Sequence, residues 1–416
     1  MAKLQILHIG KYYDPFKGGI ENFLLDLLES ETVRQGCDNW VLAHHHETRK
    51  PTETDTINGV TVTRVQLWKR LVFAPICPGF FNALKQTLRQ QRPDIIHIHM
   101  PNVSAFACLL SSDAKQRPWV IHWHADVLGA TPDWRVKLLY PVYRLFERAL
   151  LKRAATIICT SPPYLETSKA LAGFKHKCTV VPLGIRDFSA QEVAEIMAYS
   201  PTPALNSLER GDTSDTPDTP AIADSPATPD TPERSRPTQL KLLCIGRLTY
   251  YKGHTYLLQA IADLPEIQLD IIGTGELQAS LESQINALEL GHRVHLLGHL
   301  SDAELNRAIS ACDLVCLPSI ERTEAFGLIL LEAARLKKPA LVTNVQGSGM
   351  SWVVQHERTG WVVDAACSAA LHEQLSALMN SREQLKECGH QAHIRFQEQF
   401  GISAVGKAVC SVYDPL

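Results

Sequence analysis

Short apolar runs alternate with amphipathic segments along the first half of the chain. Runs rich in Val, Ile and Leu, which are typical of strands, occur at 4–10, 39–45, 60–66, 94–100, 118–124, 156–161 and 177–185. Apolar residues recur with helical spacing at 20–36, 78–91, 102–114, 133–154 and 164–173. Strands that alternate with helices predict a parallel sheet covered on both faces.

The same alternation restarts near residue 241. Strands are expected at 241–247, 267–273, 293–299, 313–319, 339–344 and 360–363. Helices are expected at 254–264, 277–290 and 301–312 and from residue 327 onward. The pattern predicts an α/β fold with two doubly wound Rossmann-like domains. They would face each other across a cleft near the ends of their strands, where such domains bind ligands.

The composition changes abruptly between the two halves. Residues 202–238 are rich in Pro, Thr, Asp and Ser and almost lack large apolar side chains, which predicts disorder. We expect domains at 1–190 and 239–390, a linker at 191–238, and a carboxyl-terminal helix at about 391–416 that packs back on the first domain. A tolerated insertion explains the linker; a recruitment or phosphorylation segment is the alternative.

Bulk properties narrow the class of protein. The formal net charge of −3 gives no basic field for nucleic acid. Eleven scattered cysteines without a C-x-x-C pair indicate a reducing cytoplasm and no disulfide framework. The apolar run at the N-terminus is too short for a signal peptide, and no stretch reaches the ~18–20 apolar residues of a transmembrane helix. Any membrane contact would therefore be peripheral.

A helix is expected to begin at Gly327, after a loop that contains Glu324. Glycine lets a ligand approach the backbone closely. The free N–H groups and the dipole of a helix N-terminus bind anions such as a diphosphate. Glu332 lies further along the helix, where it would accept hydrogen bonds from ribose hydroxyls. Glu324 precedes the helix, within reach of a sugar.

Two cations follow the first strand of the second half. Arg247 and Lys252 stand in a strand-to-helix loop, where they would clamp a diphosphate and stabilise a departing nucleotide diphosphate. Solvated surface is the alternative for such a pair. The Gly273-Thr-Gly275 turn has Gln278 where a dinucleotide-binding loop has its third glycine, so a dehydrogenase is disfavoured.

Three motifs, in order along the chain, resemble the retaining glycosyltransferases of family GT4, which have the GT-B fold. The family's glutamate pair, separated by seven residues, is matched by Glu324 and Glu332. Its Gly-Arg and Lys-Gly signature is matched by Gly246, Arg247, Lys252 and Gly253. Its first-domain loop is matched by Gly18-Gly19-Ile20-Glu21. The resemblance covers nearly the whole chain except the linker insertion.

The resemblance implies which residues surround the donor. Those implied in catalysis are His124, Glu324, Arg247 and Lys252. Those implied in donor binding are Gly18, Gly19, Gly246, Glu276, Ala325, Phe326, Gly327, Leu328 and Glu332. In this family the glycine pair approaches the donor phosphate or the acceptor, and the cations neutralise the diphosphate. Glu332 would bind ribose, and Glu324 would lie beside the transferred sugar.

Histidines occur in pairs at several strands. The active-site histidine of this fold matches His124, and His122 is its rival because side chains repeat every two residues along a strand. We expect His97 in the core and His99 in the cleft; a structural role is the alternative for each. Residues 44–46 are adjacent histidines that alternate faces, which disfavours a metal. No D-x-D motif occurs, so we expect no metal or other cofactor.

The first domain carries surfaces suited to an acceptor or a membrane. Residues 68–81 mix two cations with apolar side chains. The helix at 133–154 carries Arg135, Lys137, Arg144, Arg148, Lys152 and Arg153. Basic and aromatic surfaces suit an anionic membrane or a lipid-diphosphate acceptor. A buried helix with a solvated basic face is the alternative.

The segment at 343–353 resembles GT4 members that build bacterial surface polysaccharides. This resemblance implies a retaining hexosyltransferase at the inner face of the cytoplasmic membrane. Its donor would be GDP-mannose or a related GDP-sugar, and its acceptor a lipid-linked molecule or a glycan. The alternatives are a UDP-sugar enzyme of the same fold, a sugar-nucleotide epimerase, a sucrose- or trehalose-type synthase, and a non-catalytic binding module.

Overall fold

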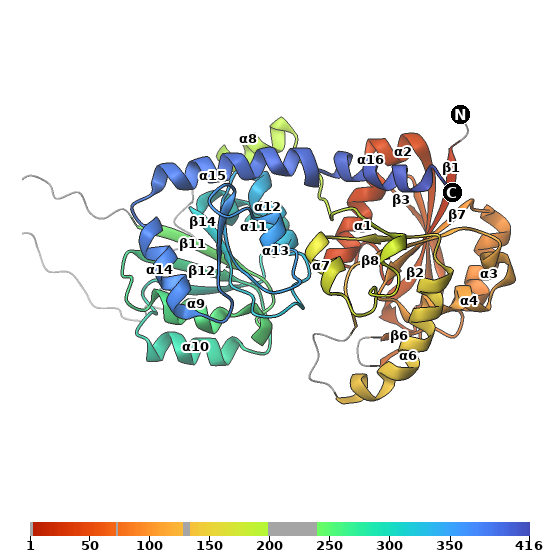
Figure 1. The fold of residues 1–416 in the computed structure, drawn as a ribbon, viewed down its shortest axis with the longest axis horizontal. Coiled ribbons are helices and arrows are strands. Elements are labelled where there is room, and N and C mark those ends of the chain that lie inside the picture. Colours follow the sequence, from red (N-terminus) through yellow and green to blue (C-terminus); the bar gives the residue numbers. More distant parts are fainter. Residues whose placement is uncertain (1–2, 72–73, 128–133, 199–238) are drawn as a thin grey trace, which may run out of the picture.

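The computed structural model describes residues 3–71, 74–127, 134–198 and 239–416. It has two lobes, each built around one sheet (Figure 1). The first part of the chain forms the lobe drawn in red to yellow, and the second part forms the lobe drawn in green to blue. The expected α/β class is confirmed.

The first domain contains an eight-stranded sheet in the order β10-β9-β8-β7-β1-β2-β4-β3. Ile6 packs into one apolar cluster and its neighbour Leu7 into another, so the sheet is buried on both faces. Among the described strands of this sheet, β3 alone is antiparallel to its neighbour. The strands are β1 (Leu4–Ile9), β2 (Cys37–Thr48), β3 (Glu53–Ile57), β4 (Val60–Leu67), β7 (Ile95–Met100), β8 (Trp119–Trp123), β9 (Thr156–Cys159) and β10 (Cys178–Val180). A separate antiparallel pair consists of β5 (Lys69–Leu71) and β6 (Ala74–Ile76).

The second domain contains a six-stranded parallel sheet in the order β13-β12-β11-β14-β15-β16. From β11 the chain adds β12 and then β13 on one side, and then crosses back to add β14, β15 and β16 on the other side of β11. In doubly wound sheets, ligands bind beyond the carboxyl ends of the strands at this reversal. The strands are β11 (Leu240–Ile245), β12 (Ile267–Ile272), β13 (Val294–Gly298), β14 (Leu314–Leu317), β15 (Ala340–Thr343) and β16 (Gly360–Val363).

Helices connect the strands in both domains. The first part of the chain forms α1 (Gly19–Glu29), α2 (Glu31–Gly36), α3 (Phe80–Gln91), η1 (Val103–Phe106), α4 (Ala107–Leu110), α5 (Ser112–Lys115), α6 (Trp134–Arg153), α7 (Pro162–Thr167), η2 (Lys175–Lys177) and α8 (Ala190–Ala198). The second forms η4 (Tyr250–Lys252), α9 (His254–Ile261), α10 (Gln278–Ala287), α11 (Asp302–Ala311), α12 (Leu328–Arg335), α13 (Met350–Val353), α14 (Ser368–Leu378), α15 (Arg382–Arg395), η5 (Phe396–Phe400) and α16 (Ile402–Tyr413).

Serines divide two segments that were expected to be single helices. The helix predicted at 20–36 is broken between α1 and α2, because Ser30 is extended and its hydroxyl accepts a hydrogen bond from the Val33 amide. The helix predicted at 102–114 becomes three short pieces, and Ser111 caps the last of them. Serine side chains compete with helical hydrogen bonds in this way and favour helix starts. Ser301 and Glu304 form a capping box at the start of α11.

The end of the chain returns to the first domain. Helices α15 and α16, joined by the π-helical η5, run across the top of the molecule from the second lobe to the first (Figure 1). There Val409 and Tyr413 join the apolar cluster of Phe23 and Leu27. Residues 190–198, the start of the expected linker, form α8, which packs beside α11. The segment 202–238, for which we expect disorder, lies outside the described residues.

Candidate active site

The two neighbouring central strands of the second sheet bring the cationic loop and the first glutamate together. β11 and β14 are paired in parallel, so the loops that follow them leave the same edge of the sheet. Lys252 Nζ lies 2.5 Å from Glu324 Oε2, and both side chains are almost buried. Ser319, two residues after the end of β14, donates to the same carboxylate oxygen over 3.5 Å. The sequence predicts that Lys252 and Glu324 both contact the nucleotide-sugar donor, and in the structure they also contact each other.

Two glycines shape the loop around this ion pair. A Cβ atom on Gly246 would lie 2.8 Å from Lys252 Nζ, and Gly246 has a positive φ of 149°. A Cβ atom on Gly253 would lie 2.0 Å from the Pro318 carbonyl oxygen, at a φ of 71°. Both positions therefore require glycine, for space and for backbone conformation. The first glycine of the signature thus makes room for the lysine side chain, and the second lets the loop pass close to the backbone at Pro318.

The Lys252 ammonium stays charged in its enclosed position. Burial lowers the pKa of Lys252, but the adjacent Glu324 carboxylate more than offsets this through its charge and its hydrogen bond, so the net pKa is raised. The loop therefore holds a fixed positive charge and a fixed carboxylate side by side.

Helix α12 begins directly after this loop. Its N-cap, Gly327, adopts the left-handed conformation (φ 79°), and a Cβ atom there would lie 3.0 Å from Leu317 and Leu330. The preceding Phe326 side chain is buried, so only its backbone is available to a ligand. The Ala325 carbonyl accepts from Gly349, in the segment after β15. The start of α12 is therefore fixed by the left-handed conformation of Gly327, by the buried Phe326 side chain and by the hydrogen bond from Gly349 to Ala325.

The first-domain glycine loop lies against this helix start. A Cβ atom on Gly19 would lie 3.1 Å from the Leu328 Cδ1 atom. Gly18 is the N-cap of α1, and Glu21 in its first turn is buried, which raises the pKa of the Glu21 carboxyl. The fold thus brings two helix N-termini, those of α1 and α12, to one place between the domains.

Glu332 occupies the middle of α12 and is partly buried. Burial raises the pKa of Glu332 to about 7; nearby Arg335 opposes this effect, and Asp302 and Asp26 reinforce it. A carboxyl group with this pKa both donates and accepts hydrogen bonds near neutral pH, which suits contact with ribose hydroxyls.

Arg247 and Glu276, which also belong to the predicted donor site, lie at the surface of the second domain. Arg247 Nη2 lies 3.2 Å from Glu276 Oε2, and both side chains are more than half exposed. A hydrogen bond from Thr249 is the main cause that lowers the pKa of Glu276. A Cβ atom on Gly273 would lie 2.0 Å from the Gly246 carbonyl oxygen, so this glycine is required by close backbone packing.

An ion pair that joins the two domains, Arg322 with Asp126, lies in the loops that carry Glu324 and His124. It was not predicted from the sequence. Arg322 Nη1 lies 2.7 Å from Asp126 Oδ2, and its guanidinium carbon lies 3.9 Å from the Tyr164 ring centroid. Asp126 also accepts from Trp123 and Ser168. Arg322 is two residues before Glu324, and Asp126 is two residues after His124. The pair therefore ties the loops of two expected active-site residues together.

His124 lies in a buried cluster of imidazoles on three adjacent strands. Register pairs His8 with His97 and His99 with His122, so their side chains share one face of the sheet with His124. All five are at most 4% exposed. His97, as expected, is in the core, where its Nδ1 lies 2.6 Å from the Tyr413 hydroxyl. His99 is fully enclosed, so its expected place at a cleft surface is wrong.

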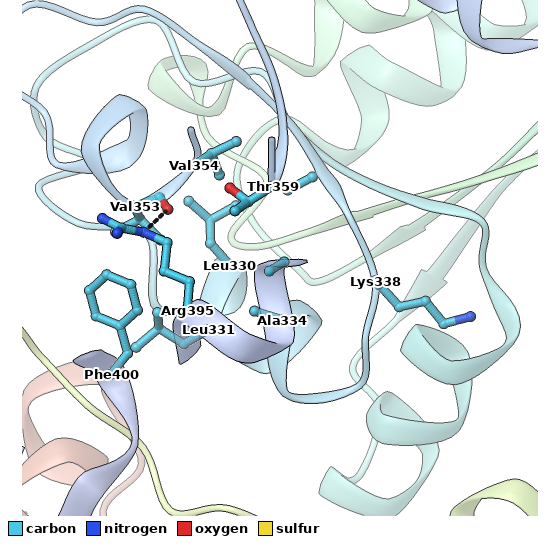
Figure 2. A pocket seen from close by; sticks show the side chains of 11 residues that line it. Leu330, Leu331, Ala334, Lys338, Val353, Val354, Thr359, Arg395 and Phe400 are labelled. Atoms are coloured by element: carbon cyan, nitrogen blue, oxygen red, sulfur yellow. Dashed lines mark hydrogen bonds between the residues drawn. The ribbon is translucent and has the colours of Figure 1, made fainter. Parts of the chain in front are cut away.

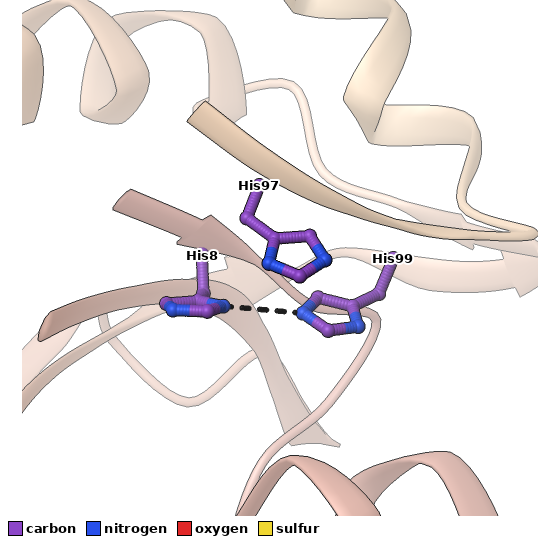
Figure 3. A group of neighbouring side chains, drawn as sticks. All are labelled: His8, His97 and His99. Atoms are coloured by element: carbon purple, nitrogen blue, oxygen red, sulfur yellow. Dashed lines mark hydrogen bonds between the residues drawn. The ribbon is translucent and has the colours of Figure 1, made fainter. Parts of the chain in front are cut away.

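Figure 3 shows His8, His97 and His99 close together, and two triplets of the cluster bring three ring nitrogens within 4.8 Å. The rings on β7 and β8 are close to parallel: His122 and His124 stack at 4.3 Å with planes 6° apart, and His97 and His99 at 4.6 Å and 15°. The His8 ring is tilted by 36° against that of His97. Imidazole lone pairs lie in the ring plane, so stacked rings do not direct them at one point. The arrangement favours hydrogen bonding over metal ligation.

The histidines at 44–46 are separated by their contacts. His44 Nε2 lies 2.8 Å from the Ser104 hydroxyl, whereas His45 Nε2 lies 3.1 Å from Glu53 Oε1 on the neighbouring part of the sheet. The two rings therefore bond to different elements, as the alternation of faces indicated.

A small cavity lies behind α12, between this helix and α15 (Figure 2). Its lining is mostly apolar, and Arg395 at its edge donates to the Val353 carbonyl oxygen. With about 10 Å³ it admits at most one water molecule. It is a packing defect of the second domain and does not take part in the site described above.

Comparison with known proteins identifies both domains. Residues 18–184 match the glycosyl transferase 4-like domain, and residues 230–395 match the glycosyl transferases group 1 family. Among its relatives are D-rhamnosyltransferase WbpZ of Pseudomonas aeruginosa, 28% identical over 95% of this chain and 92% of that protein, and O-antigen chain mannosyltransferase C of Escherichia coli, 26% identical over 99% of both.

Solved structures show the same architecture. Sucrose-phosphate synthase of Thermosynechococcus elongatus superimposes with a TM-score of 0.71 at 20% identity, over 99% of both chains. Anabaena HepE in complex with UDP and glucose gives 0.68 at 17% identity, over 99% of this chain and 100% of HepE. The two family matches show that the chain is a glycosyltransferase, with a glycosyl transferase 4-like first domain and a group 1 second domain, and the likenesses to solved structures show that it has the GT-B fold.

Proposed function

We propose that this enzyme is a retaining hexosyltransferase that transfers mannose, or a closely related sugar, from a GDP-sugar to a lipid-linked or glycan acceptor in cell-surface polysaccharide biosynthesis. The observation that carries the proposal is the enclosed Lys252–Glu324 pair at the start of α12, facing the Gly18-Gly19 loop. Two relatives that match over nearly the whole chain support the sugar and the process, since they are named as a mannosyltransferase for O-antigen and a D-rhamnosyltransferase. D-rhamnose is mannose without its 6-hydroxyl group.

The site would act mainly through electrostatics. The N-terminus of α12 and Lys252 would hold the diphosphate, with Arg247 at the open side, and would stabilise the charge that develops as the nucleotide departs. Glu324 would then exchange its lysine partner for hydroxyls of the transferred sugar. Retention would follow if the acceptor attacks from the face that the diphosphate leaves. These cations would take the role that a divalent metal has in other transferases.

Donor choice is tested first with nucleotides alone. A thermal-shift series with GDP, UDP and ADP should show the largest stabilisation with GDP, because a ligand that binds only the folded state raises its melting temperature. A clear shift with UDP and none with GDP would exclude the GDP-sugar proposal and favour a UDP-sugar enzyme of the same fold.

The reaction is tested with the complete chain, a panel of nucleotide sugars and a membrane lipid extract, followed by mass spectrometry of the products. The expected product is a lipid or glycan that gains one hexose mass. Slow hydrolysis of the donor without acceptor should also occur and should disappear in Lys252→Ala. Equal hydrolysis in both proteins would instead support a binding module without catalysis.

We further propose that α6 lies on the cytoplasmic surface of the membrane. Five apolar side chains of α6 are 43–71% exposed: Leu138, Leu139, Val142, Leu145 and Phe146. The basic residues of the helix are exposed as well, and its Glu147 is buried. Trp68, 53% exposed and covered on its ring by Lys69, directly precedes the β5–β6 pair, and both β6 and α6 contact η1. Such a surface suits an interface rich in anionic lipid. Among the described residues, no helix has the length and apolar character to cross a bilayer.

Vesicle flotation tests this surface. The protein should float with vesicles that contain anionic lipid, and Leu138→Glu together with Leu145→Glu should reduce the bound fraction severalfold. Val193→Glu changes an exposed apolar residue on α8, away from α6 in Figure 1, and should bind as wild type. Equal loss in both variants would contradict a role specific to α6.

A further inference from the structure

Three of the buried histidines form a continuous chain of ring-to-ring contacts that ends at His124. His8 Nε2 lies 3.1 Å from Asn39 Oδ1, and His8 Nδ1 lies 3.2 Å from His99 Nε2. His99 Nδ1 lies 3.1 Å from His124 Nε2. Each of these contacts uses one nitrogen of each ring, so the rings are linked head to tail from Asn39 to His124.

The three imidazoles of this hydrogen-bonded chain, those of His8, His99 and His124, are neutral. Burial is the largest cause that lowers the pKa of His8 to about 4 and that of His124 to about 3, and it lowers the pKa of His99 well below its ordinary value. A neutral imidazole has one donor nitrogen and one acceptor nitrogen, and the contact made by one nitrogen decides which form is present.

Asn39 sets the direction of the chain. Its amide nitrogen donates to the Cys37 carbonyl over 3.4 Å, so its oxygen, which only accepts, faces His8. His8 must then carry its proton on Nε2 and accept on Nδ1. His99 therefore donates from its Nε2 to His8 Nδ1 and accepts on its own Nδ1. His124 in turn donates from its Nε2 to His99 Nδ1. The Nδ1 atom of His124 is left with a free lone pair.

That atom is buried and has no hydrogen-bond partner within the described part of the chain. Buried polar atoms are nearly always paired, so an orphaned acceptor indicates a missing donor. His124 also lies close to the domain contact. Its ring packs against Phe23 on α1, four residues and therefore about 6 Å along the helix from Gly19, which touches Leu328 of the other domain.

We infer that Asn39, His8 and His99 are positioning residues that hold His124 in the Nε2–H form, so that its free Nδ1 accepts a hydrogen bond from a hydroxyl group of the bound donor sugar or acceptor. This inference rests on the proposed glycosyl transfer and adds residues remote from the substrate to it. His97 and His122 do not belong to this hydrogen-bonded chain. His97 is hydrogen-bonded to Tyr413, and neither ring nitrogen of His122 has a partner among the described residues.

Matched substitutions of Asn39 test the direction of the chain. Asn39→Leu removes the acceptor that sets it, so both directions become accessible and only a fraction of the enzyme keeps the free Nδ1. The rate of transfer should fall between about twofold and tenfold. Asn39→Asp keeps an acceptor oxygen and should retain most of the activity. The dissociation constant of the nucleotide diphosphate should stay unchanged in both, because Asn39 is remote from the residues proposed to hold the diphosphate, Lys252, Arg247 and the start of α12.

Two assays separate the possible sources of the hydroxyl. If it belongs to the donor sugar, Asn39→Leu should slow donor hydrolysis and transfer alike. If it belongs to the acceptor, only transfer should slow. Equal transfer rates in wild type and both variants would overturn the inference.

Nitrogen-15 NMR of histidine-labelled protein provides a readout that does not require turnover. The ring signals of His124, assigned by their loss in His124→Gln, should show the Nε2–H form in the wild type and in Asn39→Asp, and a mixture in Asn39→Leu. An Nδ1–H form in the wild type would overturn the inference. So would stoichiometric metal in the purified protein that is lost in His99→Ala, because ligation would occupy the lone pairs. Absence of transfer in the wild type, with the NMR result as expected, would count against the proposed function alone.

Discussion

At the residue scale, the most consequential contact is that between Lys252 and Glu324. Each almost buried charge is compensated by the other, so removal of one leaves the other unpaired. Replacement of Lys252 with Met should lower the rate of donor hydrolysis by roughly 100-fold or more, since a fixed charge is lost from the diphosphate site. It should also destabilise the fold by about 1–3 kcal/mol.

The double variant Lys252→Met, Glu324→Gln separates these two effects. It removes the unpaired carboxylate, so thermal unfolding should return toward the wild-type temperature while donor hydrolysis stays low. Recovery of hydrolysis in the double variant would contradict the catalytic role of the lysine. The exposed Arg247 provides a comparison, and Arg247→Ala should cost less activity than the lysine replacement.

Glu332 gives a pH dependence with a defined sign. Burial raises the pKa of its carboxyl from 4.5 to about 7. The folded chain therefore keeps a proton that the unfolded chain has released between these values, and stability falls as the pH rises through this window. Calorimetry should find Glu332→Gln equal in stability to wild type near pH 4.5 and more stable by roughly 1–3 kcal/mol above pH 7. A difference that does not change with pH would contradict this account.

At the element scale, the N-terminus of α12 depends on one backbone conformation. Gly327 is left-handed and crowded by Leu317 and Leu330, whereas Gly298, at the end of β13, is left-handed with open space around it. Either glycine replaced by Ala should lose about 1 kcal/mol or somewhat more to backbone strain. Only Gly327→Ala should also weaken nucleotide binding, by about tenfold, as measured by calorimetric titration. Equal affinities would show that the helix start does not hold the diphosphate.

Elements were predictable from the sequence where burial alone determines them. The parallel strands of both sheets follow from apolar runs, because parallel strands are buried on both faces. The antiparallel edge strand β3 was missed, because its sequence is mostly polar and exposed. Helix boundaries failed where Ser30 and Ser111 satisfy backbone amides locally and start a new helix. The small antiparallel pair of β5 and β6 was also missed, since three-residue strands carry no periodicity.

At the scale of the whole molecule, the ion pair of Arg322 and Asp126 holds the domains in the orientation described. We expect Arg322→Ala to raise the donor KM by about tenfold and to increase the radius of gyration measured by small-angle X-ray scattering, because a charge-assisted contact contributes about 1.5–3 kcal/mol. Lys17 also bridges the domains, to Asp302, but both side chains are highly exposed. Lys17→Ala should therefore change neither quantity, and an equal change would weaken the case for the more enclosed pair.

Residues of the candidate site could be proposed from the sequence where local motifs mark them, and not where the fold brings distant residues together. The motifs identified Lys252, Glu324 and the glycine loops, whose local sequence carries the signal. The Arg322–Asp126 pair joins residues 196 positions apart, and the contact of His8 with His99 spans 91. His8 does stand in an expected strand. Its partners become visible only once β1, β7 and β8 are known to be neighbours.

The return of α16 to the first domain constrains the order of events on the ribosome. The first domain is synthesised long before residues 402–413, yet Val409 and Tyr413 belong to its core. Domains usually fold as they emerge, with the N-terminal one first. We therefore expect that domain to keep the apolar residues of α1 and α2 that contact α16 uncovered until α16 has been synthesised. A nascent chain held at residue 400 should therefore be more sensitive to proteases, and more dependent on chaperones, than a chain that includes α16.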